Sequence, residues 1–170
     1  MRIPALLLLS ILVSGCTGIP DRVTPVSDFD VGRYLGKWYE IARLDHSFER
    51  GLEQVTAGYS LRDDGGVDVV NRGYSPETGA WEEAHGKAYF VRSANEGYLK
   101  VSFFGPFYGS YIIFELDSHY RYTFISGPDK SYLWLLARTP TVPNAVIDRF
   151  IMKSKALGFD TGGLIFPRQR

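Results

Sequence analysis

Gly36-Lys37-Trp38-Tyr39-Glu40-Ile41-Ala42-Arg43 is the stretch that decides the fold of this chain. It is the first strongly strand-like run after a polar leader that contains two prolines, and it carries one of the three tryptophans. A glycine lets the backbone adopt an unusual φ and approach a bulky group closely, and a tryptophan has a large apolar surface to bury. The stretch by itself predicts a strand whose first glycine forms a bulge beside a buried tryptophan.

The chain that follows is a succession of short strand-like runs separated by polar turns. Clusters of Gly, Pro and Asp, such as 63–66 and 127–130, are short enough to join neighbouring antiparallel strands. Consecutive hairpins predict an all-β, eight-stranded antiparallel up-and-down barrel, because closure removes exposed strand edges. A barrel of this size holds packed side chains or one small ligand. The expected strands are 38–44, 53–61, 67–74, 81–91, 98–104, 111–116, 121–126 and 132–138.

The pattern changes once, between residues 142 and 157. The apolar positions here have helical spacing, Pro143 suits a first helical turn, and Gly158 suits the position after the last turn. We therefore expect one C-terminal α-helix, packed against the outside of the barrel. The apolar positions are Val146, Ile147, Phe150, Ile151 and Leu157.

The first residues have the features of an export signal rather than of a folded domain. Arg2 precedes an apolar run that is too short to span a bilayer, and small residues then lead into Cys16, which is the only cysteine. This run resembles the bacterial lipobox, in which the cysteine is lipidated and becomes the mature N-terminus. We therefore expect a lipoprotein signal peptide at 1–15, a lipidated tether at 16–28 and a barrel domain at 29–170. Because Thr17 rather than Asp follows Cys16, this resemblance favours the outer membrane.

Composition and motifs argue against several functions. The net charge is zero and the basic residues are scattered, so no nucleic-acid surface is expected. No nucleophile motif, phosphate loop or paired acid and base is found, which predicts a protein that is not an enzyme and needs no cofactor. His46, His85 and His119 fall in or beside different loops, so no metal site is expected.

Three signals together resemble the lipocalin family. Gly36-x-Trp38 enters the first strand, Gly127-Pro128-Asp129 stands where the family has its second motif, and Arg138 follows the eighth strand. The resemblance implies that Arg138 packs across Trp38 at the closed end of the barrel, where a guanidinium gains cation–π attraction from an indole. Longer stretches, among them 48–53, 59–66, 86–90 and 99–109, are similar to the bacterial outer-membrane branch of the family.

Strand alternation then predicts which side chains face the interior. If Arg138 faces inward, Leu136, Trp134 and Tyr132 share its phase. If Trp38 faces inward, Glu40 and Ala42 follow it, and Glu40, if it is buried, needs a Tyr or Arg partner. A local bulge that exposes Glu40 is the alternative.

The aromatic stretch 103–109, with two glycines and a proline, is the other informative region. Its apolar surface is expected to be covered, by lining the barrel mouth, by contacting a second copy of the chain in a homodimer, or by touching the membrane. The resemblance favours the mouth, with Phe103 and Tyr108 as ligand contacts, and implies that the ligand is a fatty acid or lysophospholipid, stored or transported in the cell envelope. The alternative is an envelope scaffold whose barrel is filled by side chains.

Overall fold

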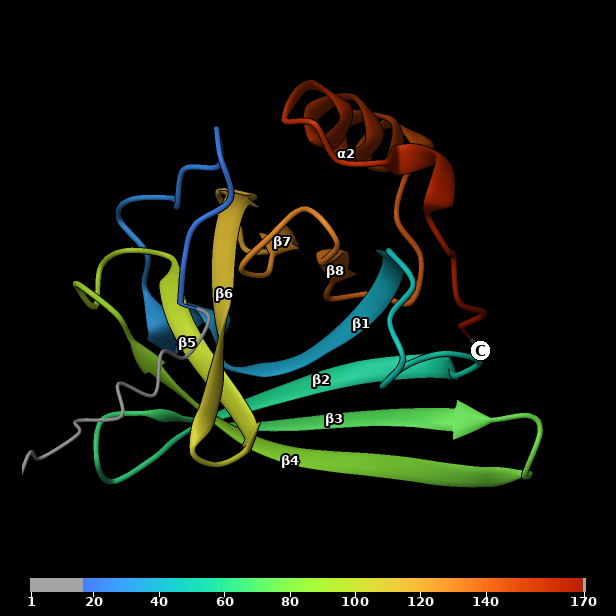
Figure 1. Ribbon diagram of the computed structural model, residues 1–170, viewed down its shortest axis with the longest axis horizontal. Coiled ribbons are helices and arrows are strands. Elements are labelled where there is room, and N and C mark those ends of the chain that lie inside the picture. Colours follow the sequence, from blue (N-terminus) through green and yellow to red (C-terminus); the bar gives the residue numbers. More distant parts are fainter. Residues whose placement is uncertain (1–16, 170) are drawn as a thin grey trace, which may run out of the picture.

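The computed structural model describes residues 17–169, so Cys16 and the expected signal peptide lie outside the described residues. Eight strands form one closed antiparallel barrel in which each strand pairs with the next and β1 pairs with β8 (Figure 1). The prediction of an eight-stranded barrel with one main C-terminal helix is confirmed. The strands are β1 (Gly36–Arg43), β2 (Glu53–Leu61), β3 (Val67–Ser75), β4 (Ala80–Phe90), β5 (Tyr98–Phe104), β6 (Phe107–Leu116), β7 (Tyr122–Ser126) and β8 (Leu133–Ala137).

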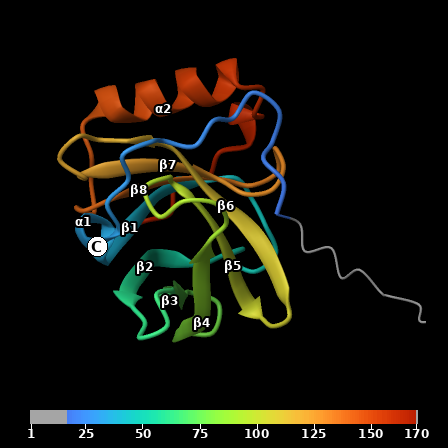
Figure 2. The same cartoon turned by 90° about the vertical axis from the view of Figure 1, so that its left-hand side faces the viewer.

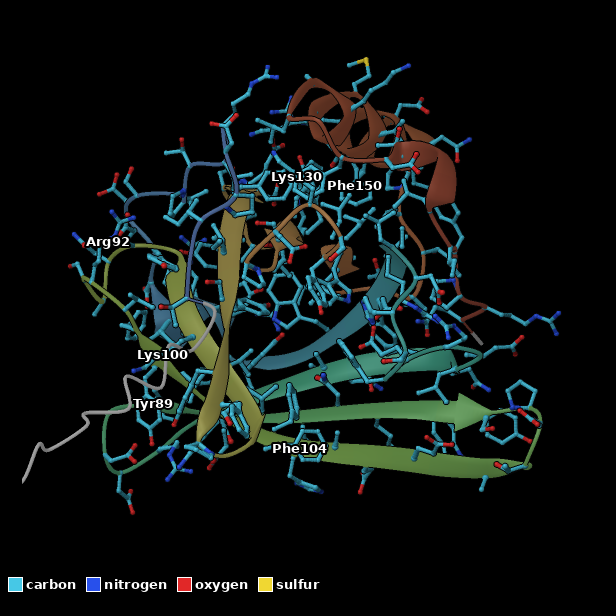
Figure 3. The ribbon with its side chains drawn as sticks, viewed as in Figure 1. Tyr89, Arg92, Lys100, Phe104, Lys130 and Phe150 are labelled. Atoms are coloured by element: carbon cyan, nitrogen blue, oxygen red, sulfur yellow. The ribbon has the colours of Figure 1, made fainter. Side chains whose placement is uncertain are left out.

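Three helical segments accompany the barrel. The short α1 (Val31–Tyr34) precedes β1, α2 (Asn144–Ala156) lies outside the barrel, and the 3-10 turn η1 (Thr161–Gly163) follows α2 (Figure 2). Phe150, on the inner face of α2, is fully buried, and its ring meets that of Phe124 edge-on at a centroid distance of 5.0 Å (Figure 3). Within residues 17–169, no helix combines the length and the hydropathy needed to cross a bilayer.

Strand alternation gives the barrel wall two separate apolar clusters. The outer cluster packs the wall against α2 and includes Ile112, Phe124 and Leu135, whereas the inner cluster includes Trp38, Val69 and Ile125. β1 and β5 to β8 thus contribute to both an interior and an exterior cluster, whereas β2, β3 and β4 contribute buried residues to the interior one only, because α2 covers just one side of the barrel.

A β-bulge interrupts β1 and changes which residues face the interior. Glu40 pairs with Leu136 but Ala42 pairs with Leu135, so Ile41 is an additional residue opposite β8. The prediction that Ala42 faces inward is therefore wrong: Ala42 is fully buried in the outer cluster, beneath α2. Arg43, which strict alternation would place outside, instead directs its side chain to Glu40.

Residues 17–28, expected as a tether, lie along the outer surface of β5 and β6. The backbone N–H of Val26 donates to Ile113 O at 2.9 Å, and Gly97 N–H donates to Val26 O at 2.9 Å. Val23 is buried in the outer cluster, 6% exposed. At Gly97 a Cβ would lie 2.8 Å from the Val26 side chain, so the segment can approach this closely only beside a glycine. The segment is therefore docked on the domain.

The barrel cavity as a candidate binding site

The barrel encloses a cavity of about 370 Å³. Its wall consists mainly of small and branched apolar side chains from β2 to β5, because alternate residues of these strands face the interior. Characteristic wall residues are Val55, Ala57, Val67, Val69, Leu99 and Val101. The interior is thus not filled by side chains, and its chemistry suits a hydrocarbon.

One end of the barrel is closed by α1 and by the pair Trp38 and Arg138. The Arg138 guanidinium carbon lies 3.9 Å from the Trp38 ring centroid, and the indole N–H of Trp38 donates to Tyr34 O at 2.8 Å. Arg138 also donates to Lys37 O at 3.1 Å and to Arg33 O at 2.8 Å. Gly36 has φ +93°, a conformation that a side chain would strain, and Arg138 Nη1 would lie 3.5 Å from an added Cβ.

Three tyrosine hydroxyls form a chain at the inner end of the cavity. Tyr111 shares hydrogen bonds with Tyr34 at 2.7 Å and with Tyr59 at 2.8 Å, and all three residues line the cavity. Burial raises the pKa of each of these phenols, so the hydroxyls stay neutral. Because the hydroxyls bond to one another, the floor of the cavity carries polar atoms without carrying charge.

The opposite end is open, and loops form its rim. Phe48 and Glu49 come from the β1–β2 loop, and Gly127 to Asp129 come from the β7–β8 turn. Phe103 lines the cavity near the end of β5. The Asn71 side-chain oxygen is buried in the wall and accepts no hydrogen bond within residues 17–169. It is therefore available as an acceptor for a polar group on a ligand.

A buried charge cluster lies on one side of the cavity. Arg43, 1% exposed, donates to Glu40 Oε1 at 2.5 Å and to the backbone oxygen of Glu49 at 2.7 Å. The Glu49 carboxylate accepts from the Trp134 indole at 3.2 Å. Burial raises the pKa of Glu40 well above its usual range, the charge of Glu49 adds to this, and Arg43 opposes it. Burial also raises the pKa of Glu49.

His46 stands beside this cluster and extends it with aromatic surface. Its ring stacks on Phe48 at a centroid distance of 4.2 Å and lies 5.0 Å from the ring of Trp134. Burial lowers the pKa of His46 to about 4, and the positive charge of Arg43 adds to the effect. His46 is therefore neutral at pH 7. Its Nε2 is 3.5 Å from Glu49 Oε2, but neither ring nitrogen makes a hydrogen bond within residues 17–169.

The structure separates the expected ligand contacts into two groups. Five of the seven expected ligand contacts line the cavity, namely Glu40, Phe103, Tyr132, Trp134 and Leu136. Glu40 is 2% exposed, so the alternative of an exposed Glu40 does not hold, and its partner is an arginine.

Tyr108 is the second residue, besides Ala42, that does not line the cavity. Because Gly109 and Tyr111 face inward, Tyr108 has the opposite phase and lies on the outer face of β6. Its ring lies 6.4 Å from that of Tyr89, and the Lys100 ammonium is 5.0 Å from its centroid. The expectation that Tyr108 contacts the ligand at the barrel mouth is wrong for this geometric reason, because Tyr108 does not line the cavity.

Sequence reasoning missed Arg43, Glu49 and the tyrosine chain. The position of Arg43 depends on the bulge at Ile41, which no local pattern marks. Glu49 lies in the loop between β1 and β2, and its carboxylate is placed by long-range contacts with β1 and β8.

A closed barrel with an apolar cavity, plugged at one end and open at the other, defines a binding barrel for small apolar ligands. The model of the lipocalin-like domain matches residues 29–169, and the chain therefore belongs to the lipocalin family. It is 63% identical over 171 residues to the outer membrane lipoprotein Blc of Vibrio cholerae, with both chains covered in full. Identity to the protein of the same name in Escherichia coli K12 is 53% over 150 residues, 88% of this chain and 85% of the relative.

Solved structures agree on the fold. Insecticyanin of the tobacco hornworm Manduca sexta has a TM-score of 0.72 at 22% identity, covering 90% of this chain and 87% of that chain. At this identity the similarity shows the fold alone. The bacterial relatives, in contrast, place this chain at the outer membrane as a lipoprotein of the lipocalin family.

Proposed function

We propose that the chain binds one lipid with an acyl chain, a fatty acid or a lysophospholipid, in the barrel, and stores or carries it in the cell envelope. The observation that carries this proposal is the apolar cavity of about 370 Å³, closed at the Trp38 end and open at the other. Its volume falls in the range of about 300–1,000 Å³ that is typical of small-molecule sites. The acyl chain would enter at the β1–β2 and β7–β8 loops and extend towards the tyrosine chain.

The polar groups of the site support a head group near the rim. Glu49 and Asp129 line the cavity there, and Trp134 and Tyr132 have apolar rings with polar atoms at one edge. A zwitterionic lysophospholipid would place its ammonium group near these carboxylates. We expect no catalysis, because these groups hold and orient a ligand without forming a nucleophile and base pair.

The anchor forms part of the same proposal. Cys16 would be acylated and would hold the domain at the membrane, where several acyl chains on one residue give stable attachment. The periplasmic face of the outer membrane is the side that fits a carrier of envelope lipids. With the domain anchored in this way, a lipid-binding cavity would lie beside a source of lipid.

A titration with a fluorescent fatty acid, followed by displacement with a lysophospholipid, tests the binding proposal. Ala88 lines the cavity, so Ala88→Phe would fill space that the acyl chain needs and is expected to abolish binding. Ala156 is exposed on α2, and Ala156→Phe serves as the matched control that keeps the parent affinity. Equal binding by a folded Ala88→Phe variant and by the parent would show that the ligand does not occupy the barrel.

A further inference from the structure

The β5–β6 turn presents the most exposed large apolar surface of residues 17–169. Phe104 is 80% exposed and Phe107 is 67% exposed, and the two residues pair across the turn. The two residues between them are Gly105 and Pro106, so both rings stand at the tip of the hairpin, and the proline ring fixes φ at its own position. Two adjacent phenyl rings in water are unfavourable, so an apolar environment is expected to cover them.

The turn belongs to the rim of the cavity. Phe103, the residue before Phe104, lines the cavity, and so does Gly109, two residues after Phe107. Whatever covers the tip is therefore adjacent to the entrance through which a ligand would pass.

The start of the described chain contacts the two strands that this turn joins. The Ser110 hydroxyl donates to Gly18 O at 2.6 Å, and the Tyr98 hydroxyl donates to Thr17 O. Ser110 is three residues from Phe107, which is about 10 Å along a strand. In Figure 2, the first coloured part of the chain and the β5–β6 turn both lie on the side of the barrel opposite α1.

The docking of Thr17 and Gly18 limits the distance between the acylated Cys16 and the exposed rings of Phe104 and Phe107. Cys16 directly precedes Thr17, and consecutive Cα atoms are about 3.8 Å apart. If Cys16 is acylated, no free tether separates the lipid from the domain, because residues 17–28 are docked on β5 and β6. The nearest extended apolar phase is then the membrane that holds the anchor.

The residues around the tip have the chemistry of a membrane interface. Lys100 and the exposed Lys87 lie on the outer faces of neighbouring strands, with Tyr89 and Tyr108 beside them. Tyrosine and lysine side chains are favoured where hydrocarbon meets lipid head groups. Figure 3 shows Lys100 and Tyr89 near each other, with Phe104 further along the β4–β5–β6 wall at the turn.

We propose that the β5–β6 turn inserts Phe104 and Phe107 into the phospholipid surface that holds the acylated Cys16, so that the cavity opens next to that surface. This inference rests on the proposed lipidation, and it gives the lipid-binding function a route by which the ligand enters directly from the membrane. If a protein partner or a second copy of the chain covered Phe104 and Phe107 instead, the two rings would be protected in the absence of a membrane.

Site-directed spin labelling of the full-length, lipidated protein tests this orientation. Cys16 is the only cysteine and is blocked when acylated, so Phe104→Cys creates a single reactive thiol. The protein is placed in vesicles of phosphatidylethanolamine and phosphatidylglycerol, and the accessibility of the nitroxide to oxygen and to a hydrophilic nickel complex is measured. Leu61→Cys, at the far end of β2, and Met152→Cys, on α2, are controls, since these residues are 56% and 69% exposed.

The label at position 104 is expected to lose most of its accessibility to the nickel complex in vesicles and to gain accessibility to oxygen, while both control positions stay accessible to nickel. Equal nickel accessibility at 104 and 61 would overturn the proposal. So would protection at 104 that develops in detergent micelles without vesicles as the protein concentration rises, which would show a second copy.

A second variant separates this inference from the binding function. Phe104→Ser with Phe107→Ser is expected to slow the uptake of a fluorescent fatty acid from vesicles but to leave its affinity unchanged when it is delivered from solution. Unchanged uptake from vesicles would refute the membrane contact alone. If the parent protein does not bind the fluorescent fatty acid delivered from solution, the binding function itself is refuted.

Discussion

Replacing Arg43 by Met removes the one arginine or lysine, among residues 17–169, that contacts the two buried carboxyl groups on the side of the cavity. Arg43 and Glu40 are 1% and 2% exposed, and Arg43 Nη1 lies 2.5 Å from Glu40 Oε1. Removing one partner of a buried ion pair leaves the other without compensation, which typically costs about 3–5 kcal/mol. We expect Arg43→Met to lower the free energy of unfolding by this amount at pH 7, measured by urea denaturation. Arg72→Met removes an exposed arginine 3.8 Å from a carboxylate and should change stability by less than about 1 kcal/mol.

The pH dependence of this loss identifies its cause. Burial and Glu49 raise the pKa of Glu40 in the folded protein, and without Arg43 that pKa rises further. A carboxyl group whose pKa is raised by folding contributes most to stability below its unfolded pKa, and this contribution is lost as the pH rises through the folded pKa. The deficit of Arg43→Met relative to the parent should therefore shrink as the pH falls from 7 towards 4. Adding Glu40→Gln should restore part of the lost stability. A deficit below about 1 kcal/mol, or one that does not change with pH, would refute the description of these carboxyls as buried and dependent on Arg43.

Three further variants test the other parts of the site. Because folding lowers the pKa of His46 to about 4, the parent should lose up to about 3 kcal/mol of stability as the pH falls from about 6.5 to 4. His46→Gln should lack this part of the slope in urea titrations, and an unchanged slope would contradict a buried neutral histidine. Trp134→Ala should raise the dissociation constant of a fluorescent fatty acid about tenfold, whereas Trp81→Ala, which removes a tryptophan that does not line the cavity, should not. Arg138→Met removes a cation–π contact and hydrogen bonds to backbone oxygens, and should lower the free energy of unfolding by about 2–3 kcal/mol. A loss below about 0.5 kcal/mol would show that Arg138 is a solvated charge.

The barrel and its closed end follow from local patterns. Strand-like runs joined by short Gly, Pro and Asp turns have few arrangements other than consecutive hairpins. Eight strands connected in this way close into a barrel. Trp38 and Arg138 lie far apart in sequence, but their positions at the start of the first strand and after the last place them side by side once β1 pairs with β8.

The parts that could not be predicted depend on long-range packing. One additional residue at Ile41 reverses the phase of β1, turning Ala42 towards α2 and Arg43 towards Glu40. The register of β6 determines which way Tyr108 points. Tyr111 of the same strand faces the interior and makes hydrogen bonds there, so Tyr108, three residues earlier, faces outward. A strand pattern alone assigns faces only as far as its register is uninterrupted. Docking of residues 17–28 likewise depends on contacts with β5 and β6 rather than on their own composition.

The identity of the lipid that the native protein carries tests the central claim most directly. Full-length protein is purified from membranes, and the bound lipid is extracted and identified by mass, with Ala88→Phe prepared in parallel. We expect one fatty acid or lysophospholipid per barrel in the parent and none above background in the variant. The same lipid in equal amount from both proteins, or none from the parent, would contradict binding inside the barrel.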